Sequence, residues 1–187
     1  MAIVLTNLAV SFKDLVSDVG TTQLYPLGTK REQDGQIYRY VQRDDSTVNF
    51  AAGDLVYRAG STAAALWKVS GDLSDQDSAF ACGVAMGSIA DAGYGWVKTY
   101  GLVTNLKKKP GTAAYSLAKG DVLVAAQAAT DDGRVSRWVG LISTLTLGAL
   151  RAQLNTSIRR VSERIVGWAV AVATNSATSC SAFIDLE

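Results

Sequence analysis

Short apolar runs, separated by clusters of glycine, serine and aspartate, make up most of the chain, and this pattern predicts β structure. The runs are rich in β-branched and aromatic side chains, and Asp34-Gly35 is a pair typical of a tight hairpin turn. Strands this short at regular spacing favour a mainly β fold, a sandwich or barrel of short antiparallel strands, over alternating βαβ units. We predict strands at 27–31, 36–41, 54–58, 66–69, 81–86, 95–100, 101–104, 121–126 and 134–139.

Two segments depart from this pattern. The apolar positions of residues 1–22 fit neither one helical stripe nor one strand, which indicates an extended arm that docks on its own domain or on a neighbouring subunit. Residues 146–164 carry leucine and isoleucine at steps of three and four, which predicts an amphipathic helix. A β-hairpin that turns near residues 155–156 is the alternative.

A weak internal echo suggests a diverged duplication. Residues 53–56 resemble 120–123, and residues 83–86 followed by 95–97 resemble 167–170 followed by 182–184. We therefore predict an N-terminal arm over 1–22 and a single β-rich domain over 23–187, with possible sub-units 23–110 and 111–187.

Composition removes most enzyme classes. The chain has 187 residues, of which 48% are hydrophobic, and it contains no histidine, which excludes Ser-His-Asp and Cys-His nucleophiles and every histidine-containing metal site. Two cysteines cannot form a four-cysteine zinc site. Cys82 and Cys180 lie in apolar runs of small residues, which favours two reduced core residues over a disulfide.

The charge balance argues against two classes of partner. The chain carries 18 Lys and Arg against 17 Asp and Glu, so it lacks the positive field of a nucleic-acid or acidic-membrane binder. No window approaches the ~18 continuous apolar residues that a membrane span needs. We expect no nucleic acid and no membrane as partners.

Candidate chemistry is sparse. The acidic pairs at 44–45 and 131–132 lie in turn contexts, and the acidic stretch 72–77 lacks the mid-loop glycine and closing glutamate of a calcium loop. Lys107, Lys108 and Lys109 precede Pro-Gly, which is typical of an exposed loop and would attract an acidic partner surface. We expect no catalytic residue, metal or cofactor.

The turn and strand motifs support a family resemblance. They are Tyr25-Pro26-Leu27-Gly28, the strand from Gly35 to Val41, the Ala52-Gly53 turn, and a glycine-rich hairpin that ends in Trp96-Val97. This order resembles the head decoration, or capsid cement, proteins of tailed bacteriophages over residues 23–104, and more loosely over 118–186. The arm and residues 141–164 depart from the shorter members.

The resemblance implies a small, β-rich, non-enzymatic subunit that binds an assembled capsid and strengthens it. It implies the major capsid protein as partner, a homo-oligomer with a trimer favoured, and no small-molecule substrate or cofactor. The place of action would be the capsid exterior of the virion, after synthesis in the host bacterial cytoplasm. We expect capsid or inter-subunit contacts at Ile3, Val4, Leu5, Leu8, Phe12, Lys107, Lys108 and Lys109.

Two other classes stay open. The chain could be another virion or tail-associated β module, or a carbohydrate-binding module in which an exposed tryptophan at position 67, 96, 138 or 168 stacks on sugar. It could also be an enzyme with histidine-free chemistry based on serine or lysine, although no particular pair stands out.

Overall fold

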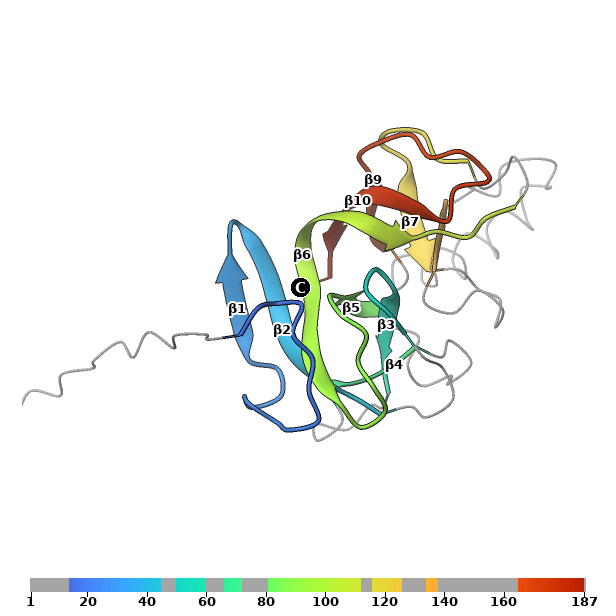
Figure 1. Ribbon diagram of the computed structural model, residues 1–187. Helices are drawn as coiled ribbons and strands as arrows, with labels where there is room; N and C mark the ends of the chain where they lie inside the picture. The colour runs from blue at the N-terminus through green and yellow to red at the C-terminus, as the bar shows by residue number, and fades with distance from the viewer. Residues whose placement is uncertain are drawn as a thin grey trace, which may run out of the picture.

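The described residues form ten strands in one sheet, which confirms the prediction of a mainly β fold (Figure 1). The computed structural model describes residues 14–44, 50–59, 66–71, 81–111, 116–125, 134–137 and 165–186. These ranges contain strands, turns and bends, and no helix. The strands are β1 (Lys30–Gln33), β2 (Gln36–Arg43), β3 (Leu55–Arg58), β4 (Lys68–Ser70), β5 (Ala81–Ala85), β6 (Tyr94–Lys107), β7 (Val122–Ala125), β8 (Val135–Arg137), β9 (Ile165–Ala169) and β10 (Ser179–Asp185).

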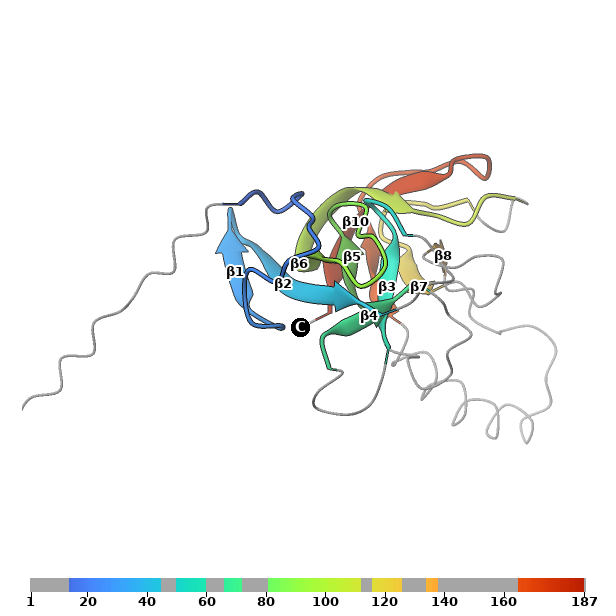
Figure 2. The same cartoon turned by 60° about the horizontal axis from the view of Figure 1, so that its bottom comes forward.

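The first half of the sheet closes into a ring of five strands. The sheet runs β1-β2-β4-β3-β5-β6, and β2 also pairs with β6, which closes the ring β2-β4-β3-β5-β6 (Figure 2). The β2–β4 pair is parallel and the other four pairs of the ring are antiparallel. Outside the ring, β1 pairs with β2 through the predicted hairpin, whose turn residues Asp34 and Gly35 have positive φ angles of 52° and 71°.

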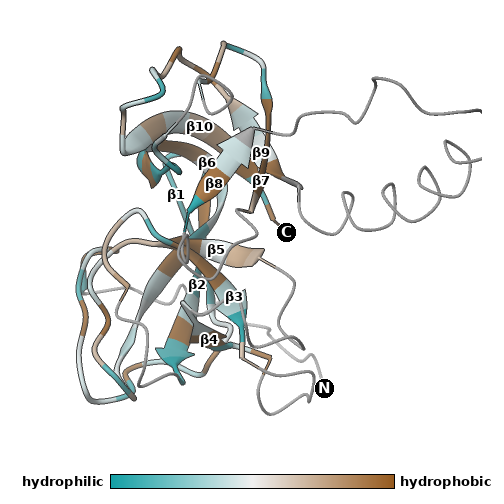
Figure 3. Cartoon of the chain, turned by 90° about the vertical axis from the view of Figure 1, so that its right-hand side faces the viewer, coloured by the Kyte–Doolittle hydropathy of each residue, from teal (hydrophilic) through white to brown (hydrophobic). Residues whose placement is uncertain are grey.

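The second half repeats this arrangement around the continuation of β6. The order continues β6-β10-β9-β7-β8, and a parallel bridge between Lys108 and Val135 brings β8 back to the end of β6. The 14-residue β6 is therefore the last strand of the first ring and the first strand of the second. Two separate strands at 95–100 and 101–104 were a wrong prediction, because the strand continues through Gly101, whose φ is 117°. The rings form two lobes (Figure 3).

The two rings match strand for strand and turn for turn. The turns before β3 and β7 contain Gly53 and Gly120, with φ angles of 91° and 90°. In each turn the next residue, Asp54 or Asp121, accepts a hydrogen bond through Oδ2 from the main chain three residues earlier, at 2.7 and 2.8 Å. Both β3–β5 and β7–β9 carry a register shift at the same place. The fold thus contains an internal duplication.

The sequence echo corresponds to this structural duplication, except that β10 was aligned with β6 in the wrong register. The pairs Leu55↔Val84 and Val122↔Trp168 place residues 83–86 and 167–170 at equivalent positions, as the echo suggested. The pairs Ala85↔Val97 and Ala169↔Ala182 make Val97 equivalent to Ala182, two positions away from the match that the sequence suggested. The strands were matched correctly, but β10 has almost no residue in common with the first half of β6, so the register was not readable.

Each ring encloses its own apolar interior. Every strand of the first ring contributes a buried side chain to one cluster, which includes Val41, Val56, Val69, Cys82 and Val97. Every strand of the second ring does the same through Leu106, Leu123, Val135, Val166 and Ala182, and this larger cluster extends to Leu55, Tyr57 and Val84 on the first ring. The rings therefore pack against each other through apolar contacts.

The cysteines are free and buried, as predicted. Burial raises the pKa of Cys82 to about 12 and that of Cys180 to about 11, because a thiolate is poorly solvated in an apolar interior. Both thiols therefore belong to the core and stay protonated at neutral pH.

Several predicted features lie outside the described residues. They are the arm residues before Asp14, the helix or hairpin at 146–164, and the acidic stretches 72–77 and 131–132. Within the part of the chain that is described, no helix has the length and hydrophobicity to cross a membrane.

Candidate interaction site at the N-terminal anchor

Residues 14–28, here called the N-terminal segment, cross the outer face of the first ring. Within one cluster, Val16, Tyr25 and Leu27 of this segment pack against buried aromatic side chains of β2 and β6. Gly20 forms an isolated antiparallel bridge with Tyr94, through two main-chain hydrogen bonds of 3.0 and 2.7 Å. The segment is therefore fixed to the ring by its side chains and by its backbone.

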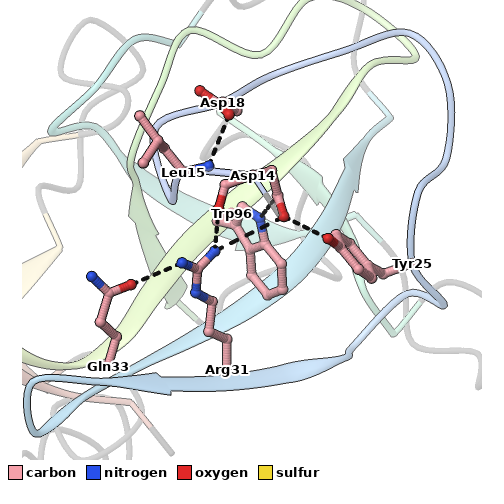
Figure 4. A network of polar contacts seen from close by, with 7 residues as sticks. All are labelled: Asp14, Leu15, Asp18, Tyr25, Arg31, Gln33 and Trp96. Carbon is pink, nitrogen blue, oxygen red and sulfur yellow. Dashed lines mark hydrogen bonds and ion pairs between the residues drawn. The ribbon is translucent and has the colours of Figure 1, made fainter. Parts of the chain in front are cut away.

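Asp14, the first described residue, is the centre of a polar network (Figure 4). Tyr25 donates its hydroxyl to Asp14 Oδ1 at 2.5 Å, and Trp96 donates Nε1–H to Oδ2 at 2.6 Å. Arg31 Nη1 donates to the Asp14 carbonyl oxygen at 2.8 Å and lies 4.0 Å from Oδ1. One carboxylate thus joins the segment, the β1 hairpin and β6.

The electrostatics favour the ionised form of Asp14. Burial alone would raise the pKa of the carboxyl, but the hydrogen bonds from Tyr25 and Trp96 and the charge of Arg31 favour the carboxylate, so the net pKa is lowered. The Arg31 guanidinium also lies 5.7 Å from the centre of the Trp96 ring. The network is consequently charged at neutral pH.

Four aromatic rings lie together at this site. The centroid of Tyr40 lies 5.2 Å from Tyr25, 5.1 Å from Trp96 and 6.1 Å from Tyr94. Trp96 is fully buried and Tyr40 is 3% exposed. Edge-to-face and stacked pairs at these distances each contribute roughly 0.5–1.5 kcal/mol beyond their buried area. The polar network is therefore held on a rigid base.

The same segment leaves other apolar side chains in solvent. Leu15, Val19 and Leu24 are 66%, 46% and 64% exposed. They flank the point at which the predicted arm joins the ring, so this surface is partly apolar where a partner of the arm would meet it.

The predicted contact residues are not brought together. Ile3, Val4, Leu5, Leu8 and Phe12 precede the described residues, and the three lysines lie at the other end of β6 from Trp96. Trp96 and Lys107 are eleven positions apart on β6, and a strand rises by roughly 3.3 Å per residue. The anchor and the lysine cluster are thus separate places on the molecule.

The exposed-loop interpretation of the lysines was wrong. Lys107 ends β6 and its ammonium lies 3.0 Å from Asp54, while Lys109 donates its main-chain N–H to Val135 at 2.9 Å. Lys108 is 1% exposed, and its ammonium donates to the carbonyls of Lys109 and Ala177 at 3.0 and 3.2 Å. The run belongs to the closure of the second ring, because Lys108 occupies the position of the buried Arg43 in the first.

The tryptophans differ from one another. Trp96 is buried in the anchor, and Trp67 is half-buried below Arg39 and Arg58, whose guanidinium carbons lie 5.3 and 5.9 Å from its ring. Trp168 on β9 is 44% exposed and stacks on Phe183 at 5.1 Å with an interplanar angle of 15°. Position 138 lies outside the described residues.

Sequence reasoning missed Asp14. An aspartate within a largely apolar N-terminal stretch was the available signal, but its partners Tyr25, Arg31 and Trp96 lie 11, 17 and 82 positions away. Only the fold brings them together.

The described ranges contain no group of three or more acidic or cysteine side chains that could hold a metal ion. What they define is a mainly β chain of two repeated rings, with an extended N-terminal segment bound on the outside. Comparison with protein-family models, with curated proteins and with solved structures found no match for this chain.

Proposed function

We propose that this chain is a structural protein of a tailed-bacteriophage head, which binds the outside of the assembled capsid and stabilises it without catalysis. The observation that carries the proposal is the Asp14 anchor. It binds the N-terminal segment to a closed ring directly after the apolar arm residues, so the arm begins at the surface of the ring.

The anchor lowers the entropic cost of binding through the arm. Each apolar arm side chain that becomes fully buried on the major capsid protein contributes roughly 1.5–3 kcal/mol before ordering costs. Residues 14–28 are already fixed on the ring, so they lose little further freedom when the arm binds. Exposed Leu15 and Leu24 extend the apolar contact beside the anchor.

A homo-oligomer, with a trimer favoured, would multiply these contacts. Linked binding sites convert later contacts into intramolecular ones, so several modest arms give strong attachment to a symmetric capsid. Closed rings suit this role, because pairing of all five strands leaves few free strand edges.

The test is co-sedimentation of the purified chain with mature phage head shells from the same source, stripped of their accessory proteins. We expect saturation at a fixed copy number per capsid subunit and a higher temperature of shell rupture. The arm variant Leu5→Ser/Leu8→Ser/Phe12→Ser should bind more weakly. A matched control is Val172→Ser, which replaces an apolar side chain that is 75% exposed and lies outside both the arm and the anchor. Absence of binding by the wild-type chain would overturn the proposal.

A further inference from the structure

Two side chains on the outer face of the second ring are exposed where the equivalent side chains of the first ring are buried. The register of the strands makes three pairs of positions equivalent, one on each of three neighbouring strands. In the order first ring then second ring, the pairs are Tyr38 and Leu102, Lys98 and Phe183, and Val84 and Trp168.

Burial differs sharply between the two rings. In the first ring Tyr38, Lys98 and Val84 are 5%, 6% and 0% exposed. In the second ring Leu102 and Trp168 are each 44% exposed. Phe183, between them, is partly buried. The second-ring set is also the more apolar one, since a phenylalanine stands where the first ring has a lysine.

Two elements cover the first ring's outer face. Tyr38 lies in the cluster that the N-terminal segment completes, together with Tyr25 and Leu27. Val84 packs into the cluster of the second ring. The chain therefore already uses its own extended N-terminal residues to cover this face of a ring.

The exposed aromatic group is ordered by its own contacts. Phe183 lies between Trp168, at 5.1 Å and nearly parallel, and Tyr100, at 5.0 Å and perpendicular. Leu102 is the strand partner of Phe183 on β6, and β9 carries Trp168 beside β10 in the upper lobe (Figure 3). The four side chains form one apolar surface across β6, β10 and β9, here called the second-ring face.

We propose that the second-ring face binds the N-terminal arm, residues 1–13, of a second copy of this chain. The arm is directly continuous with the segment that covers the first ring, it contains no acidic residue, and its only charged side chain is that of Lys13. Thirteen extended residues reach up to about 45 Å, enough to pass from one ring to a neighbouring molecule. Trp168 and Leu102, each 44% exposed, give the arm of a second copy an apolar surface to cover.

This inference deepens the proposed function, because it uses the same arm, but its test needs no capsid. Oligomer formation by the full chain is measured by sedimentation velocity and mass photometry over a range of concentrations. Trp168→Ser should raise the dissociation constant of the oligomer by about 10- to 100-fold, the range for loss of a central aromatic anchor. Leu102→Ser, the second variant, should act in the same direction. The matched control Val172→Ser, which replaces a side chain that is 75% exposed and lies outside the second-ring face, should have no effect.

Mixing two defective chains decides between binding in cis and in trans. The arm variant Leu5→Ser/Leu8→Ser/Phe12→Ser keeps an intact second-ring face, and Trp168→Ser keeps an intact arm. At a concentration above the dissociation constant of wild type and below those of the variants, each variant alone should be mainly monomeric. An equimolar mixture should form more complex than either alone, because each chain supplies what the other lacks. A mixture that stays monomeric while wild-type chains associate overturns the proposal.

Two further outcomes would also overturn it. A wild-type chain that is monomeric at every concentration has no arm exchange, whether or not it binds capsids. In the second outcome, Trp168→Ser forms oligomers like those of wild type. If that variant also loses a glycan-induced fluorescence change, the second-ring face binds sugar instead, and if it loses capsid binding, the face binds the capsid instead. Capsid binding without oligomers would leave the proposed function standing and remove only this inference.

Discussion

The internal duplication supplies a matched pair of substitutions, Gly53→Ala and Gly120→Ala. Both glycines lie in the same turn of their ring, with φ angles of 91° and 90° and an aspartate next in the chain. A Cβ at Gly53 would lie 2.2 Å from the carbonyl oxygen of Asn105, whereas a Cβ at Gly120 meets nothing within 4 Å. The backbone strain is thus shared, and only the close approach of β6 differs.

The expected difference in stability between the two variants follows from which part of the structure has to move in each. The positive φ costs roughly 1–2 kcal/mol in both variants, partly offset by the lower entropy of the unfolded chain. In Gly53→Ala the end of β6 must also shift by several tenths of an ångström or more. That strains the 2.8 Å hydrogen bond from Lys107 to the Gly53 carbonyl and the adjacent ion pair between Lys107 and Asp54. Overpacking of this kind costs about 1–3 kcal/mol and a strained hydrogen bond about 1 kcal/mol.

We therefore expect Gly53→Ala to be less stable than Gly120→Ala by about 2–4 kcal/mol. For a chain of this size the difference corresponds to roughly 4–16 °C in Tm. Urea unfolding followed by tryptophan fluorescence, with a thermal scan on the same samples, measures both quantities. Equal stability of the two variants within about 0.5 kcal/mol would refute the close approach between the turn and β6.

Three further predictions concern the anchor and the core. In urea melts, Asp14→Ala should lower the free energy of unfolding by about 2–4 kcal/mol, because it removes the acceptors of the hydrogen bonds from Tyr25 and Trp96. Asp14→Asn should lower it by less. The control is Asp91→Ala, which replaces an exposed aspartate. Because the folded-state pKa of Asp14 lies below its ordinary 3.8, its contribution should be complete above that pH and lost as pH falls through the lower folded value. Stability curves of wild type and Asp14→Asn should therefore converge in acid, and parallel curves would contradict this. The two buried cysteines, with pKa values raised to about 12 and 11, should react with a thiol reagent at pH 8 only after unfolding, and rapid labelling of the native chain would refute their burial.

Local signals in the sequence accounted for the strands and hairpin. Glycine and aspartate turns are short-range features, so the hairpin at Asp34-Gly35 and the paired turns at Gly53 and Gly120 were readable from neighbouring residues alone. A barrel was one of the two predicted forms, but the strands that close the first ring were not readable, because the β2–β6 pairing joins residues about 60 positions apart and carries no sequence motif.

The interaction site was harder to predict from the sequence than the fold. Lysine next to Pro-Gly is usually a solvated loop, yet Lys108 lies inside the second ring because the chain returns there to meet β8. Trp96 and Trp168 look alike in sequence, but one is fully buried under the N-terminal segment and the other is 44% exposed. Whether such a side chain is buried depends on whether a segment distant in sequence packs over it. The pattern of a single sequence does not contain that information.

The sharing of β6 by both rings sets an order for folding during synthesis. The first ring can close as soon as residue 100 is available, since β2 and β5 then have their partner. The remaining half of the same strand must wait for β10, which begins at Ser179 and ends at Asp185. Until then the nascent protein carries an unpaired strand edge beside a finished domain, a template for pairing with another chain. Slow translation of the second half would therefore favour aggregation in the interval between the closure of the two rings.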